Sequence, residues 1–67
     1  MISQKEIVID SLKAQIQFME SARDRQLTWA DKTSDAEIAR AHIESAGFLQ
    51  QTLSQYKRLL DTYNKPT

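Results

Sequence analysis

Residues 34–48 read SDAEIARAHIESAGF, and this segment decides the fold because it marks where a second helix begins. Ser34 is followed three residues later by Glu37, the capping-box spacing in which each side chain satisfies a free backbone N–H of the other residue. The residues that follow at helical spacing are Ala39, His42, Ala46 and Leu49. A polar histidine therefore stands among small residues on the side where a hydrophobic seam is expected.

The pattern extends over the whole chain as two heptad stripes. The first comprises Ile2, Ile9, Leu12, Ile16, Met19, Arg23, Gln26 and Ala30. The second comprises Ala39, His42, Ala46, Leu49, Leu53, Tyr56, Leu60 and Tyr63. Ser3 and Glu6 form another capping box at the start of the chain, and Pro66 stops the second stripe. We therefore predict helices over residues 3–31 and 35–64, joined by a turn at 32–34.

Because such a short connection makes neighbouring helices run antiparallel, the expected fold is all-α, an antiparallel two-helix hairpin. It forms a single domain over residues 1–67. The turn also predicts a register between the helices. The expected neighbours are Trp29 with Ile38 and Ala39, Ile16 and Met19 with Ala46 and Leu49, and Ile9 and Leu12 with Leu53 and Tyr56.

Large apolar residues outside the two stripes indicate that the hairpin assembles with copies of itself. They are Ile7, Val8, Phe18, Leu27, Trp29, Ile38, Ile43, Phe48 and Leu59. Burying each would stabilise the protein by about 1.5–3 kcal/mol, which a lone hairpin cannot achieve. A chain this small is also only marginally stable alone. We expect a homo-oligomer, a dimeric four-helix bundle at minimum, with higher symmetric assemblies up to a hexamer permitted.

The composition narrows the classes of function. The nine basic and nine acidic residues cancel, which argues against a polyanion-binding protein and against DNA as a partner. The absence of cysteine favours the cytoplasm, and no apolar run is long enough for a membrane span or a signal peptide. We find no nucleophile beside a base, no glycine-rich phosphate loop and no metal-ligand cluster. The sequence therefore predicts a non-enzyme without metal or cofactor.

The open end of the hairpin is one candidate binding site. Lys5, Lys13, Lys57, Arg58 and Lys65 are expected to converge there, with Tyr56 and Tyr63 at the same level. Cations neutralise phosphates and aromatic rings stack on bases, so this combination suits a nucleotide ligand. A solvated helix end with ordinary core tyrosines explains the same residues, and periodicity alone favours that explanation.

The second helix offers three further candidates, each with a structural explanation. His42 could contact a ligand at a subunit interface, or could fix the register of the seam through one hydrogen bond. Arg40 could bind phosphate, although ion pairs with Glu37 and Glu44 would also account for it. Gly47 costs about 1 kcal/mol within a helix, so a neighbouring subunit or a ligand is expected to pack closely there.

The run Ile38-Ala-Arg-Ala-His-Ile-Glu-Ser-Ala46 resembles the second-helix motif of the phage cyclic-nucleotide sponges that counter CBASS immunity, a helical hairpin also found in sponges for Thoeris signals. The opening Ile2-Ser-Gln-Lys-Glu-Ile7 is similar to the start of the family's first long helix. The resemblance implies an all-helical oligomer, often a hexamer, that sequesters cyclic di- or trinucleotides without degrading them in the cytoplasm of an infected cell. Lys13 would contact ligand phosphate, and Arg40 would lie near the trinucleotide pocket.

Two departures from the family pattern bear on the site. The chain begins almost at the long helix, so the family's preceding segment, with a tyrosine that stacks on a base, has no counterpart; Tyr56 or Tyr63 would take its role. Ala41 stands where threonine is usual. The alternative function, from another class, is a structural or adaptor hairpin whose dimer binds a protein or a folded RNA. It predicts no response to small molecules.

Overall fold

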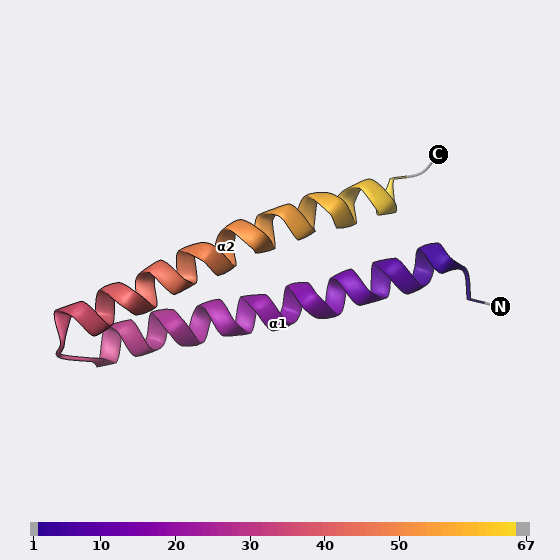
Figure 1. Ribbon diagram of the computed structural model, residues 1–67. Helices are drawn as coiled ribbons and strands as arrows, with labels where there is room; N and C mark the ends of the chain where they lie inside the picture. The colour runs from indigo at the N-terminus through magenta and orange to yellow at the C-terminus, as the bar shows by residue number, and fades with distance from the viewer. Residues whose placement is uncertain (1, 66–67) are drawn as a thin grey trace.

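The computed structural model describes residues 2–65, which form two antiparallel helices joined by a short turn (Figure 1). Helix α1 spans Gln4–Lys32 and helix α2 spans Ala36–Asn64. Each has 29 residues and is therefore about 44 Å long, which accounts for most of the 52 Å length of the hairpin. The predicted all-α hairpin is confirmed. Its helices begin one residue later than predicted, and α1 ends one residue later.

The N-cap of α2 is Asp35, so the prediction that Ser34 caps this helix is wrong. The Asp35 carboxylate accepts hydrogen bonds from the backbone N–H groups of Glu37, at 2.9 Å, and Ile38, at 3.2 Å. The Asp35 N–H donates in turn to the Thr33 hydroxyl. At the start of α1, Ser3 caps the helix as predicted by accepting from the Glu6 N–H at 3.2 Å.

Removing the N-cap of α2 should therefore lower the free energy of unfolding, by an amount that depends on which residue is changed. We expect Asp35→Ala to lower the free energy of unfolding by about 1 kcal/mol, because two N–H groups at the helix start lose their acceptor. Ser34→Ala, the matched control at an exposed position, should change it by less than about 0.5 kcal/mol. Chemical denaturation followed by circular dichroism measures both. A larger loss of stability in Ser34→Ala than in Asp35→Ala would show that Ser34 is the N-cap.

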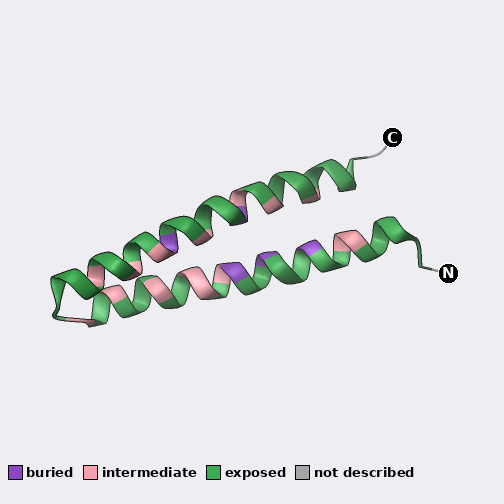
Figure 2. Ribbon diagram, viewed as in Figure 1, coloured by how far each residue is buried: buried purple, intermediate pink, exposed green. Residues whose placement is uncertain are grey.

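The core lies along the line where the two helices face each other (Figure 2). Its fully buried or nearly buried apolar side chains are Leu12, Ile16, Met19, Ala46 and Leu53. The predicted stripes are confirmed as the facing surfaces, since every stripe member from Ile9 to Leu60 is at least half-buried. Only the two outermost members, Ile2 and Tyr63, are exposed. Ile2 precedes the first residue of α1, which explains why it leaves the stripe.

The register of the seam is shifted by about one helical turn from the predicted one. Leu53, which is completely buried, forms the centre of the core with Ile16 and Met19, whereas we expected it opposite Ile9 and Leu12. Leu49 packs against this cluster as predicted. The shift arises because helical side chains lean toward the N-terminus of their own helix. In an antiparallel pair these leans are opposed, so each residue meets a partner further from the turn along α2.

Eight of the nine large apolar residues predicted to lie outside the seam are exposed, from Leu59 at 44% to Phe48 at 71%. The exception is Val8, which is half-buried at the edge of the seam. The helices lie closest near the turn and diverge toward the chain ends (Figure 1). The small seam residues Ala30, Ala39 and Ala46 allow the close approach, whereas Leu53, Tyr56 and Leu60 hold the helices further apart.

Candidate functional site

The five predicted ligand contacts, Lys13, Arg40, His42, Tyr56 and Tyr63, are not gathered at one place on the hairpin. Lys13 lies 19 residues before the end of α1, whereas Arg40 is in the second turn of α2. These positions are roughly 20 Å apart along the helix axes. Tyr63 lies in the last turn of α2, close to the chain end. The single hairpin therefore does not bring these side chains around one ligand.

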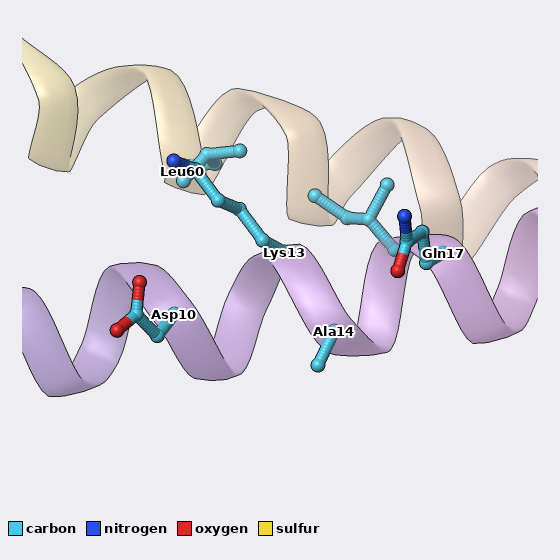
Figure 3. Close-up of a pocket in the computed structure, with 6 residues that line it drawn as sticks. Asp10, Lys13, Ala14, Gln17 and Leu60 are labelled. Atoms are coloured by element: carbon cyan, nitrogen blue, oxygen red, sulfur yellow. The ribbon is translucent and has the colours of Figure 1, made fainter.

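Lys13 lines an open groove at the edge of the seam (Figure 3). The groove is formed by Asp10, Lys13, Ala14, Ile16 and Gln17 of α1 with Leu60 of α2. The Lys13 side chain extends from α1 toward α2 and ends beside Leu60 (Figure 3). Arg58, which was expected to converge with Lys13, instead lines a polar groove formed by α2 alone. The two cations therefore lie in different grooves.

Tyr56 is half-buried and lines an apolar groove on the other side of Ala14 from Lys13. Its neighbours there are Ala14, Gln15, Phe18 and Met19 of α1. Phe18 is 70% exposed, so this groove presents two aromatic side chains from different helices. Aromatic faces of this kind can stack on a nucleobase or pack against a second protein surface.

His42 is held in the seam by one hydrogen bond and one aromatic contact. Its Nδ1, assigned the proton, donates to Oε1 of Gln26 at 2.6 Å, across the two helices. The Trp29 ring lies 5.6 Å from the imidazole, centroid to centroid, at an angle of 55°. This is the register-fixing role expected of a polar seam residue. It does not conflict with a ligand contact at a subunit interface, because His42 is only half-buried.

Arg23 forms the other polar link between the helices. Its guanidinium donates to the side-chain oxygen of Gln50 at 2.7 Å and pairs with Asp24 at 3.0 Å. These two polar contacts thus link the helices on the turn side of the Ile16, Met19 and Leu53 cluster. Sequence reasoning placed Arg23 in the stripe but gave it no partner, because the identity of the partner depends on the register.

Arg40 is exposed, and the ion pairs expected to account for it are not formed. The only ion pair among residues 2–65 joins Arg23 to Asp24, so Arg40 pairs with neither Glu37 nor Glu44. Its guanidinium therefore retains its full set of donors. A guanidinium with free donors is well suited to a phosphate or a carboxylate, which it can bind through two parallel hydrogen bonds.

Gly47 lies in a groove on the opposite side of α2 from Tyr56, together with Leu27 and Ile43. A Cβ atom built at Gly47 would meet no heavy atom within 4 Å. Nothing in the described part of the hairpin therefore requires glycine here. The close approach of another molecule at this position stays a prediction.

Between residues 2 and 65 there is no group of three or more side chains that could hold a metal ion. Neither α1 nor α2 is apolar enough over a sufficient length to cross a bilayer. No protein-family model, no curated protein sequence and no solved structure matches the chain.

Proposed function

We propose that this chain is a non-catalytic sponge that binds and sequesters a cyclic di- or trinucleotide immune signal inside an infected cell, without cleaving it. The observation that supports this proposal most directly concerns the side chain of Arg40. It belongs to the segment that resembles the sponge motif, residues 38–46, and it is exposed without an ion pair to any residue in the described range 2–65. Phosphate oxygens of the ligand would occupy its free donors.

The ligand pocket would form where copies of the hairpin meet. Lys13 and Arg40 are too far apart on one hairpin to hold the phosphates of one small ligand, so they would either act in different pockets or come from different copies. Tyr56 or Tyr63 would stack on a base, and His42 would donate a hydrogen bond near the interface. A pocket of this kind requires a homo-oligomer, for which the exposed apolar side chains provide the driving force.

The direct test is isothermal titration calorimetry against cyclic dinucleotides, cyclic trinucleotides and cyclic ADP-ribose isomers. We expect saturable binding of at least one ligand that is recovered intact afterwards. Arg40→Ala or Lys13→Ala should weaken that binding by about 10- to 100-fold, because a hydrogen bond to a charged group contributes about 1.5–3 kcal/mol.

Lys32→Gln serves as the matched control, since Lys32 is an exposed cation in the last turn of α1 and is not part of the proposed site. It should leave the affinity unchanged. A flat response to the whole panel would exclude the sponge. An equal loss in Lys32→Gln would show that binding reflects only general charge attraction.

A second candidate is an adaptor hairpin whose dimer binds a protein or a folded RNA. The observation that favours it is that no groove described above contains two of the five predicted ligand contacts. Such a protein would give no response to the nucleotide panel. It would instead yield a defined partner when the tagged oligomer is used as bait.

A further inference from the structure

A second apolar stripe runs along α1, outside the seam. Ile7, Phe18 and Trp29 follow one another at intervals of eleven residues, and each is about half exposed or more. Eleven residues make three helical turns plus only about 20°, so these side chains project from the same side of the helix. Most of the residues between them on that side are small, namely Ser11, Ala14 and Ala22. The exception is Arg25, which follows Ile7 by five helical turns and therefore projects in the same direction.

Helix α2 carries a matching stripe. Phe48 and Leu59 are eleven residues apart and are 71% and 44% exposed. Ile38, 49% exposed, lies ten residues before Phe48 and is turned about 80° from it toward the seam. The intervening positions on that side are Ala41, Ser45 and Thr52, which are small or short, and Gln55, which lies seven residues after Phe48 and four before Leu59. Large apolar side chains thus recur along both helices outside the core, separated mainly by small residues and also by Arg25 and Gln55.

Both stripes lie on one face of the hairpin. Phe18 and Tyr56 line the same groove, and Tyr56 is adjacent to Leu59 on the surface of α2 because residues three apart are neighbours. Leu27 and Ile43 line a groove on the opposite face. We call the surface made by the six large residues Ile7, Phe18, Trp29, Ile38, Phe48 and Leu59 the apolar face.

The register makes the large residues of the apolar face alternate between the helices. Trp29 contacts His42, and Met19 packs with Leu53. The numbers of two residues that lie at the same level on α1 and α2 therefore add up to about 71. Phe48 therefore lies between the levels of Phe18 and Trp29, and Leu59 lies between those of Ile7 and Phe18. The apolar face is therefore a zigzag of large apolar side chains separated mainly by small ones, with Arg25 and Gln55 also on it.

The charges divide the hairpin into two halves of opposite sign. Residues 19–51, the half nearer the turn, contain six acidic and four basic side chains, for a net charge of −2. The remaining residues, at the open end, contain three acidic and five basic side chains, for a net charge of +2. The neutral chain is therefore an elongated dipole.

We propose that the apolar face binds a second copy of this chain in antiparallel orientation, so that the acidic turn half of each copy lies over the basic open half of the other. The proposal rests on the assembly that the proposed function requires, but not on the ligand. With the two-fold axis at the middle of the apolar face, Phe18 lies over Ala22 of the second copy. Leu59 lies over Ala41 and Ser45 of the second copy.

The area of the apolar face fits a second copy of the chain. Its six large side chains together expose roughly 600 Å², taking roughly 100 Å² for each. A stable interface buries about 800 Å² per partner, and the small residues between the large ones would supply the remainder. A parallel pair would also interleave large with small residues. It would place like-charged halves together, however, and charge complementarity is what sets the orientation of such a pair.

A distance between two labels decides the orientation. Ser34→Cys introduces the only cysteine of the chain, at an exposed turn position that does not cap α2. With a spin label at this cysteine, pulsed electron resonance of the full chain should give an intermolecular distance of about 40 Å, since the two turns lie at opposite ends of the pair. A distance below about 20 Å would overturn the antiparallel orientation. No intermolecular distance at micromolar concentration would overturn the interface.

Matched substitutions on the two faces test which surface is used. Phe48→Glu, on the apolar face, should weaken association measured by sedimentation at least about 30-fold, because a central aromatic residue contributes about 2 kcal/mol or more. Ile43→Glu, an exposed residue on the opposite face, should leave the pair intact. The reverse result would overturn the proposal. If Phe48→Glu loses its helical circular dichroism, the milder Phe48→Ala replaces it and is judged in the same way.

None of these measurements contains nucleotide, so they separate the interface from the sponge. An antiparallel pair that ignores the nucleotide panel would uphold the interface and remove the sponge. A chain that binds nucleotide, but in which the distance between the two labels is below about 20 Å or is not observed, would support the sponge and remove the antiparallel interface.

Discussion

The substitution Leu53→Ala is expected to lower the free energy of unfolding by about 2–5 kcal/mol. Among residues 2–65, Leu53 is the one large side chain with no exposed surface, and it joins Ile16 and Met19 across the seam. Truncation removes its buried methyl groups and leaves a cavity that two rigid helices cannot close. For a domain of this size the loss is comparable to the whole stability of the fold. Urea denaturation followed by far-ultraviolet circular dichroism measures it.

Leu27→Ala provides the matched control, since Leu27 is also in a helix but is 45% exposed. The same atoms are removed, yet they are partly solvated in the folded chain, so the loss should stay below about 1 kcal/mol. Equal losses in the two variants would mean that Leu53 is not the centre of the core. A larger loss in Leu27→Ala would point to a copy of the chain packed on that side.

The stripes could be predicted because burial follows helical spacing closely in a two-helix protein. The members of the first stripe from Ile9 to Ala30 face the members of the second stripe from Ala39 to Leu60, as their spacing indicates. The cap of α2 could not be predicted to the residue. Ser34 and Asp35 are both good N-cap residues, and the choice between them depends on the hydrogen bond from Asp35 to Thr33 in the turn.

The partners across the seam were harder to predict because they depend on the register. A shift of one turn exchanges every neighbour while leaving both stripes unchanged. The pairs Gln26 with His42 and Arg23 with Gln50 were therefore not predicted. Gln26, His42 and Arg23 were placed in the stripes, whereas Gln50 lies outside the predicted second stripe. A glutamine opposite a histidine and an arginine opposite a glutamine are the polar signals that could have fixed the register.

The candidate site was predicted less well than the fold. Convergence of Lys13 with Arg58 was expected from the number of residues between each of them and the turn, but these side chains lie in different grooves. The spacing from the turn gives only the level of a residue along the hairpin. The side of the helix then decides whether two residues at similar levels can hold one ligand.

Dilution should lower the stability of this protein strongly. The experiment tests the premise shared by the sponge and the antiparallel pair, namely that the chain assembles with copies of itself. Only five apolar side chains are buried in the described part of the single hairpin, whereas ten large ones are exposed. If folding requires a second copy, unfolding of one dimer releases two chains. Each ten-fold dilution then lowers the apparent stability of the dimer by about 1.4 kcal/mol.

A hundred-fold dilution should thus lower the apparent stability by about 2.7 kcal/mol and move the thermal midpoint by several degrees. Circular dichroism at two path lengths measures the midpoint at both concentrations, with sedimentation at each to report the mass. Phe48→Glu is the internal comparison, because a chain that no longer pairs should either lose its helical signal or melt at a lower midpoint that does not change with concentration. A wild-type midpoint that stays constant, with a folded monomer in sedimentation, would contradict the premise. The seam core around Leu53 would then be sufficient alone, and the apolar face would need an occupant other than a second copy.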